Sequence, residues 1–240
     1  MKIITLDEVA STNTYVKQHI AELEGDSVVL THCQTAGRGQ RGNSWEAEPG
    51  KNLTFSLLLR RPAVKVQEQF RLSEAVALAT VETLDAFATG FSIKWPNDIY
   101  HNDDKIAGVL IEQSLDGNAI DYSIVGIGLN VNQRRFVSDA PNPVSLWQIT
   151  GEETALEPLL ERLCERILER CNHLNNKELH TAYLKRLWRN DGSMHPYSLP
   201  DGTAVSARIV DVEPDGHLLL AHAGSPTPRR YAFKEIAALL

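Results

Sequence analysis

Two neighbouring strand patterns set the strongest limit on what this chain can fold into. Residues 105–115 read KIAGVLIEQSL and residues 121–131 read DYSIVGIGLNV, and both are rich in apolar and β-branched residues. The short turn sequence Asp116-Gly117-Asn118 lies between them. This combination is typical of an antiparallel β-hairpin. We therefore expect a sheet with antiparallel pairs at the centre of the fold.

Further patterns predict helices around that sheet. Helical spacing of apolar residues is expected from Ser11 or Thr12 to Leu23 and over residues 67–88, 155–173 and 176–189. Additional strands are expected at residues 2–6, 27–34, 52–60 and 91–95, and residues 134–144 read as a loop. The order of these elements predicts an α+β fold, with a mixed or antiparallel sheet flanked by helices.

The pattern changes after Met194. Residues 203–212, 217–223 and 229–233 read as short antiparallel strands, with turn signals at Asp201-Gly202 and Asp215-Gly216. We predict two domains: a catalytic domain over residues 1–192 and a small C-terminal β domain, of SH3-like barrel size, over residues 193–240.

Composition excludes several classes of protein. The formal net charge of -7 argues against a general nucleic-acid binder, which carries a basic face. Cys33, Cys164 and Cys171 are too few and too scattered for a disulfide framework or a structural zinc site. No apolar run approaches the roughly 20 residues that span a bilayer, and the N-terminus does not read as a signal peptide. We expect a cytoplasmic protein.

A glycine-rich stretch from Thr35 to Lys51 includes the run GRGQRGNSW, which starts at Gly37. Closely spaced glycines let several backbone N–H groups point at one anion, a phosphate above all. Arg38 and Arg41 add charges with a geometry suited to phosphate or carboxylate. The structural alternative is a surface loop. The run is neither a P-loop nor a dinucleotide fingerprint.

Two further polar groups flank strands. In the motif KWPND, Pro96 ends a strand and leaves Asn97 and Asp98 at the tip of a turn. Lys105 opens the following strand, where it could reach the same side or be a solvated charge. Gly108 within that strand indicates a close approach by a ligand ring, a bulge or tight packing.

Two shorter motifs leave their alternatives open. Ser11-Thr12-Asn13 reads as a helix N-cap or as a polar binding wall, and Gln34 at the end of a strand is similarly ambiguous. The run GIGLNVN, which includes Asn130, fits either close packing around a ligand or a corner of the sheet.

The motifs STN, QTAGRGQRGNSW, KWPND, KIAG and GIGLNVN, in this order, resemble the catalytic domain of biotin protein ligases (biotin–[acetyl-CoA-carboxylase] ligases). The resemblance is to the short form of the family, without an N-terminal DNA-binding domain. It implies a class II synthetase-like α+β catalytic domain and a small C-terminal SH3-like β-barrel.

The resemblance also implies a two-step reaction. Biotin and ATP, with Mg²⁺ as part of the substrate complex, give biotinyl-5′-AMP and pyrophosphate. Biotin then passes to a lysine of a biotin carboxyl carrier protein, by default a subunit of acetyl-CoA carboxylase. No tightly bound cofactor, DNA or membrane is implied as a partner, no metal ligands are identified, and the protein is expected to be a monomer or a homodimer.

Site residues follow from the motif matches. The resemblance gives catalytic roles to Lys105, Arg38 and Asp98. Biotin is expected at Ser11, Thr12, Asn13, Gln34, Arg38, Gly39, Gln40, Lys105 and Gly108. ATP or the adenylate is expected at Arg38, Arg41, Trp45, Asn97, Asp98, Asn130 and Trp147.

The chain departs from the family pattern at Gln40, where many members have arginine. Either Arg41 replaces that charge, or Arg38 and Lys105 carry more of the phosphate binding.

Two rival functions remain. A lipoate ligase or octanoyltransferase has the same fold but needs a long apolar groove, whereas this chain offers the polar residues Ser11 to Asn13 and Gln34. A non-catalytic biotin-responsive binder or repressor would not release pyrophosphate, and the presence of Lys105 argues against it.

Overall fold

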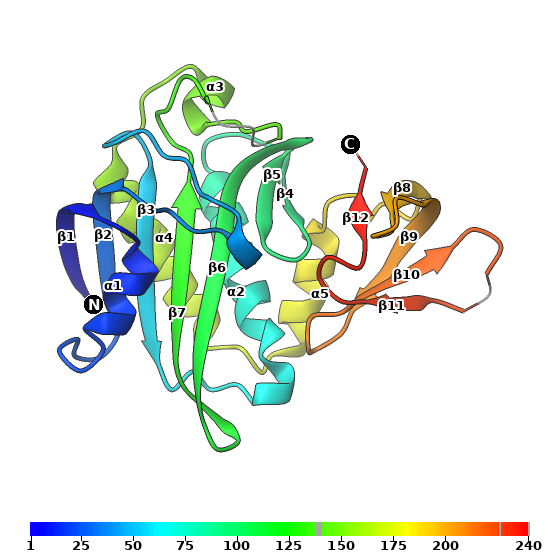
Figure 1. Ribbon diagram of the computed structural model, residues 1–240, viewed down its shortest axis with the longest axis horizontal. Helices are drawn as coiled ribbons and strands as arrows, with labels where there is room; N and C mark the ends of the chain where they lie inside the picture. The colour runs from blue at the N-terminus through cyan, green and yellow to red at the C-terminus, as the bar shows by residue number, and fades with distance from the viewer. Residues whose placement is uncertain (138–140, 226, 240) are drawn as a thin grey trace.

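The computed structural model describes residues 1–137, 141–225 and 227–239. Its main feature is a seven-stranded sheet with the strand order β1-β2-β3-β7-β6-β5-β4 (Figure 1). β1 and β2 are parallel, and every other neighbouring pair is antiparallel. The strands are β1 (Lys2–Val9), β2 (Ser27–Gln34), β3 (Leu53–Arg60), β4 (Phe91–Lys94), β5 (Asp98–His101), β6 (Asp104–Asp116) and β7 (Ala119–Leu129).

The predicted hairpin forms the centre of this sheet. β6 and β7 pair antiparallel from Ala107 opposite Leu129 down to Asp116 opposite Ala119. Many of its apolar residues lie in a buried core, and Gly126 and Gly128 are on the same face of β7 because they are two residues apart. The hairpin prediction is confirmed.

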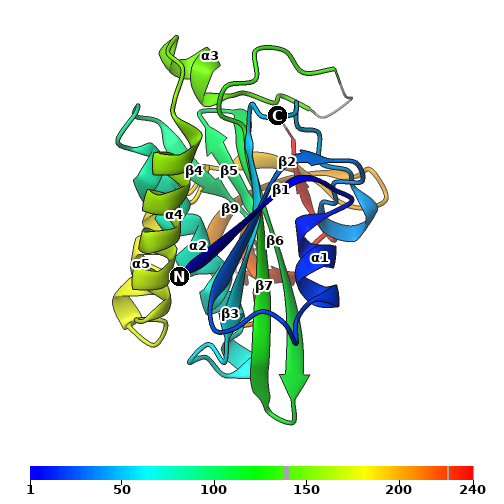
Figure 2. The same ribbon diagram turned by 90° about the vertical axis from the view of Figure 1, so that its left-hand side faces the viewer.

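Helices cover both faces of the sheet unequally (Figure 2). The short helix α1 (Thr12–Gln18) lies on one face, and α2 (Phe70–Leu84), α4 (Leu156–Cys171) and α5 (Lys177–Arg186) lie on the other. β3 is buried on both sides, because Leu57 joins the core under the three helices and Leu58 joins the smaller core under α1. Since α1 is short, much of its face of the sheet is left to the cavity described below.

A second, five-stranded antiparallel sheet follows, with the order β11-β10-β9-β8-β12. It comprises β8 (His195–Ser198), β9 (Ala204–Val212), β10 (Leu218–His222), β11 (Arg229–Tyr231) and β12 (Ala237–Ala238). The predicted strands correspond to β9, β10 and β11, and all five lie within residues 193–240. The division into two domains at this boundary stays a prediction.

Several predicted element boundaries were wrong. α1 ends at Gln18 rather than Leu23, and α2 is shorter at both ends than residues 67–88. β5 was missed because four residues containing Asp98 and His101 give no apolar alternation. The helix α3 (Leu146–Thr150) was missed as well, and the glycine-rich stretch contains a 3₁₀ turn, η1 (Gln40–Gly42). Among the described residues, no helix is both long and apolar enough to cross a membrane.

Candidate active site

The strand register brings separate sequence motifs into one row across the sheet. Lys94 is opposite Asp98, Asp98 is opposite Gly108, and Gly108 is opposite Gly128. Thr54 of β3 continues the row beyond Gly128. Directly opposed residues on neighbouring strands share one face of a sheet. The motifs KWPND, KIAG and GIGLNVN therefore meet on the face that carries α1.

A cavity of about 280 Å³ opens on this face. Its walls come from the start of α1, the glycine-rich stretch, the row just described and the second sheet. The lining residues predicted from the sequence are Ser11, Thr12, Asn13, Gln34, Arg38, Gly39, Gln40, Trp45, Asn97, Asp98, Lys105 and Gly108. The cavity thus brings together most of the residues that the motifs single out.

One wall of the cavity is polar and uncharged. The backbone N–H of Thr12 donates to Oε1 of Gln34 at 2.8 Å, and the Thr12 hydroxyl lies 3.2 Å from the same oxygen. Ser56 of β3 places its hydroxyl 2.7 Å from Oγ1 of Thr12 and 2.5 Å from Oδ1 of Asn13. Ser11, the N-cap residue, makes no side-chain capping bond, so its hydroxyl does not bind the backbone of the helix. Hydroxyl and amide groups of this kind suit a neutral polar ring.

Glycines in β7 let two polar side chains approach the sheet. A Cβ at Gly126 would lie 2.3 Å from Oδ1 of Asn13, and a Cβ at Gly128 would lie 2.2 Å from Cε2 of Trp45. Any larger residue would displace these side chains. The indole of Trp45 also lies close to Gly108, so it covers the glycine row. This close approach explains the glycines that the sequence left open between ligand contact and tight packing: in this structure they accommodate Asn13 and Trp45.

The charged part of the site centres on Lys105. Its Nζ lies 2.7 Å from Oδ1 of Asp98 and 5.8 Å from the centre of the Trp45 ring. Asn97 is fixed by two bonds to the backbone of Val109, one of which runs from its side-chain amide to the carbonyl at 2.8 Å. Lys105 and Asp98 are therefore oriented by the sheet itself.

Arg38 connects the glycine-rich stretch to the sheet. Its Nη2 lies 3.4 Å from Oε2 of Glu112, and the same carboxylate oxygen accepts a 2.8 Å hydrogen bond from Nδ2 of Asn13. Arg38 also forms a β-bridge with Ser44, which closes the base of the loop. Glu112 thus joins the polar wall to the loop.

The opposite end of the cavity is cationic. Burial lowers the pKa of Lys94, although the nearby Asp98 charge opposes this shift. Lys94 donates to the hydroxyl of Tyr100 at 2.7 Å. Arg38, Lys105 and Lys234 also line the cavity, and Asp98 is the only carboxylate among its described lining residues. A pocket with this balance of charge favours anionic groups.

Asn130 and Trp147, which were predicted from the sequence, are not among these described lining residues. Asn130 donates to the carbonyl of Val144 at 3.0 Å, and its Oδ1 is buried without a hydrogen-bond partner among the described residues. Trp147 lies in α3 under the guanidinium of Arg134, 4.6 Å from the ring centre. The side chain of Arg41 lies outside the part of the chain that is described. The roles expected of these residues stay predictions.

Sequence reasoning missed three residues that the geometry places in or beside the site: Ser56, Lys94 and Glu112. The serine between apolar residues in TFSLL could have indicated Ser56, because a hydroxyl in a buried strand usually has a hydrogen-bond partner. Lys94 was part of the motif KWPND but had no assigned role. Glu112 gave no signal, since a glutamate in a strand is usually solvated.

The sequence profile described as "Biotin/lipoate A/B protein ligase family" matches residues 6–130, just over half of the 240 residues. The chain belongs to the biotin/lipoate A/B protein ligase family. The matched segment of this ligase-family chain contains the polar wall, the glycine-rich stretch, the KWPND motif and the central hairpin.

Curated members of the family are similar over the same region. A bifunctional ligase/repressor BirA from Escherichia coli is 34% identical over 146 residues, covering 58% of this chain and 44% of the relative. A biotin–[acetyl-CoA-carboxylase] ligase from Paracoccus denitrificans is 38% identical over 124 residues, covering 50% of this chain and 51% of the relative. The match therefore spans about half of each relative or less.

The solved structures extend the likeness to nearly the whole chain. A biotin protein ligase from Aquifex aeolicus, in complex with biotin and ATP, superimposes with a TM-score of 0.79 and 27% identity. The superposition covers 98% of this chain and 97% of that protein. The predicted α+β class of this ligase-family chain, with a helix-flanked mixed sheet and a second C-terminal β element, is confirmed.

Proposed function

We propose that this chain is a biotin protein ligase that activates biotin with ATP and transfers it to a lysine of a carrier protein. The observation that carries the proposal is a single cavity with an uncharged polar wall at one end and clustered cations at the other. Biotin has a neutral cyclic urea and a carboxylate, so its two ends match these two environments. The relatives named as biotin ligases, and the Aquifex aeolicus structure with biotin and ATP, support the same assignment.

In the first step, an oxygen of the biotin carboxylate attacks the α-phosphorus of ATP and pyrophosphate leaves. Two anions must approach each other, so the site has to neutralise charge as the bond forms. Lys105 holds this role, because Asp98 positions its Nζ beside the glycine row. Arg38 supplies the second charge from the loop, exchanging Glu112 for the substrate anion.

The polar wall binds the other end of biotin. Ser11, Thr12, Asn13 and Gln34 offer hydroxyl and amide groups without burying a charge, as a urea ring requires. Gly39 and Gln40 close the loop over the chain that leads to the carboxylate, with Gln40 as a neutral hydrogen-bond donor. A lipoyl or octanoyl tail is apolar and could not form hydrogen bonds with this wall.

Mg²⁺ enters this proposal as part of the ATP substrate. Asp98 is the only carboxylate among the described lining residues, and Lys105 already pairs with it. Mg²⁺ keeps several waters and binds through few carboxylates together with substrate phosphates. The donor set therefore fits a magnesium ion that is held mainly by the triphosphate, with Asp98 as its available protein ligand.

In the second step, the lysine amine of the carrier attacks the carbonyl carbon of biotinyl-5′-AMP and AMP leaves. The amine must first lose a proton, and Asp98 or the departing phosphate accepts it. Until then the acyl-adenylate must be shielded from water, which is the role we assign to the glycine-rich stretch with Trp45. The carrier is a biotin carboxyl carrier protein, such as the acetyl-CoA carboxylase subunit that the name of the Paracoccus relative indicates.

Biotin-dependent ATP–pyrophosphate exchange tests this function. Wild-type protein should exchange with biotin but not with lipoate or octanoate. Lys105→Ala should lower the exchange rate by about a hundred-fold or more, because it removes a charge that acts in the transition state, and should leave the protein folded because Lys105 is partly exposed.

Absence of exchange with biotin would refute the proposal, and turnover with lipoate or octanoate would assign the chain to that rival activity. Binding of biotin without any pyrophosphate release would instead indicate a non-catalytic binder.

A further inference from the structure

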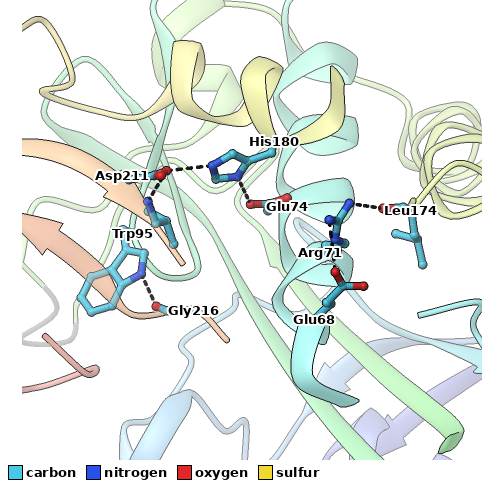
Figure 3. A network of polar contacts seen from close by, with 9 residues as sticks. Glu68, Arg71, Glu74, Trp95, Leu174, His180, Asp211 and Gly216 are labelled. Carbon is cyan, nitrogen blue, oxygen red and sulfur yellow. Dashed lines mark hydrogen bonds and ion pairs between the residues drawn. The ribbon is translucent and has the colours of Figure 1, made fainter. Parts of the chain in front are cut away.

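Trp95 of the KWPND motif contacts both sheets of the molecule. Its indole Nε1 donates a hydrogen bond to the carbonyl oxygen of Gly216 at 2.9 Å (Figure 3). Its ring packs edge-on against Phe233, with 6.3 Å between ring centres. The same side chain lines the active-site cavity and a neighbouring cavity of about 300 Å³. Trp95 is therefore part of the cavity wall where the second sheet meets the seven-stranded sheet, which we call the catalytic sheet.

The turn between β9 and β10, which contains Gly216, is itself fixed to α2. The backbone N–H of Phe70 donates to the carbonyl of Pro214 at 3.3 Å. Gly216 presses on the Phe70 ring so closely that a Cβ would lie 2.7 Å from Cδ2. Nearby, His180 of α5 lies between Asp211 of β9 and Glu74 of α2 (Figure 3). The position of the Gly216 carbonyl is thus set by several contacts.

The position of Trp95 affects the reactive end of the cavity. Asn97 and Asp98 follow it closely in the chain, and Asp98 holds Nζ of Lys105 at 2.7 Å. Asn97 exchanges two hydrogen bonds with Val109, next to Gly108. A shift of the Trp95 side chain would therefore move the turn that orients the Asp98–Lys105 pair and the cationic end of the cavity.

We propose that Trp95 is a positioning residue, held by the Gly216 carbonyl in the turn between β9 and β10, that sets the geometry of the cavity for ATP rather than for biotin. This inference rests on the proposed function. The C-terminal sheet thereby acquires a defined role, because it fixes the cationic end of the site through one indole hydrogen bond.

The selectivity for ATP follows from the order of strands. The polar wall is built on α1, β2 and β3, whereas Trp95 lies beyond β4 at the other edge of the sheet. Thr12 bonds to Gln34 and to Ser56, and Asn13 bonds to Ser56 and to β6. None of these bonds involves the second sheet. Loss of the Trp95 bond should leave this wall unchanged.

Trp95→Phe tests the proposal in the full-length protein, because it keeps an aromatic ring and removes the N–H donor. In biotin-dependent ATP–pyrophosphate exchange, the KM for ATP should rise about three- to ten-fold, the range that loss of one hydrogen bond gives. The KM for biotin should change less than about two-fold. A merely structural role would reduce the active fraction, and therefore kcat, without separating the two KM values.

Tyr231→Phe is the matched control. It removes the 2.7 Å bond between the Tyr231 hydroxyl and His222 inside the second sheet, and neither residue is among the described residues that line the cavity. This variant should lower the melting temperature while both KM values stay as in the wild type. A raised KM for ATP in Tyr231→Phe would show a general effect of weakening the sheet and would overturn the proposal.

A second variant keeps the test decisive if Trp95→Phe does not fold. Gly216→Ala changes the other end of the same bond, because alanine rarely adopts the φ of +94° at this position and its methyl group would meet the Phe70 ring. It should raise the KM for ATP in the same way. Wild-type exchange with unchanged KM values in the folded variants would refute the positioning role and leave the function standing, whereas no exchange in the wild type would refute the function itself.

Discussion

Ser56 lies in the middle of β3 and is fully buried, yet its hydroxyl contacts polar partners. That hydroxyl reaches Oγ1 of Thr12 and Oδ1 of Asn13, which are the first residues of α1. A buried amide oxygen that loses its partner costs about 1–3 kcal/mol. Ser56 therefore holds the polar wall in place from beneath.

Ser56→Ala should raise the KM for biotin about five- to fifty-fold and leave the KM for ATP nearly unchanged, because the wall loses its support while the cationic end keeps its bonds. Ser123→Ala is the control: Ser123 is also buried, in β7, but its hydroxyl has no hydrogen-bond partner in the described part of the chain. Steady-state exchange kinetics distinguish the two variants. An equal effect of both on biotin would contradict a specific role for Ser56.

The sequence predicted the residues of this site better than their partners. Lys105, Asp98 and Asn13 lie in recognisable motifs, so their place at one cavity could be expected. Ser56 and Glu112 act across 43 and 74 residues of sequence, on Asn13 and Arg38 respectively. Such pairs depend on strand register, which a single sequence does not define.

The glycine-rich stretch is largely irregular in the structure, as its composition favours. Apart from η1 and the bridge between Arg38 and Ser44, the described residues between Thr35 and Lys51 form no regular structure. Its two ends are held by backbone bonds to Ala10 and Asn132. Its middle part is held to the site by Trp45 on the glycine row and by the partly exposed Arg38–Glu112 pair. An exposed pair of this kind contributes little to stability, so closure of the loop should depend on ligands.

Limited trypsin digestion measures that closure directly, because Arg38, Arg41 and Lys51 are potential cleavage sites. Biotin with ATP should slow cleavage in this stretch about ten-fold at ligand concentrations ten times the dissociation constant. Mass spectrometry of the fragments identifies the bond that is cut. Equal cleavage with and without both ligands would show that the stretch does not close over the adenylate.

The strands that were missed from the sequence are all short, for a physical reason. β2, β3 and the hairpin of β6 and β7 bury continuous apolar runs, so their own sequences define them. β5, β8 and β12 are two to four residues long and gain their structure from neighbouring strands. α1 is shorter than its apolar pattern because the chain turns after Gln18 toward β2.

The helices α2 and α5 are joined to β9 of the second sheet by a clamp of Glu74, His180 and Asp211 (Figure 3). Nδ1 of His180 lies 2.7 Å from Glu74, and Nε2 lies 2.8 Å from Asp211. Both ring nitrogens face carboxylates, so each contact needs a proton. Burial alone would lower the pKa of His180, but the two hydrogen bonds and the two carboxylate charges raise it. Burial raises the pKa of Glu74, and His180 and Arg71 oppose that shift only in part.

The raised pKa values of His180 and Glu74 determine how the stability of the protein changes with pH. A histidine with a raised folded-state pKa stabilises the protein fully below its unfolded value, near 6.5, and loses this contribution as the pH rises through the folded pKa. The raised pKa of Glu74 acts in the same direction. His180→Gln should melt about 2–4 °C below the wild type at pH 6, and the difference should shrink toward pH 9. A gap that widens with pH would contradict the clamp.

The walls of the active-site cavity come from both ends of the chain, from Ser11 to Ala238. This has a consequence for biosynthesis. Domains fold from the N-terminus as the ribosome adds about 5–20 residues per second, so the catalytic sheet and its polar wall can form well before β10 to β12 exist. Trp95 must then wait on the order of ten seconds for Gly216. A nascent chain would therefore have the wall that we propose binds the urea ring before it has a complete site, and on this proposal the ability to consume ATP would arrive only with the last strands.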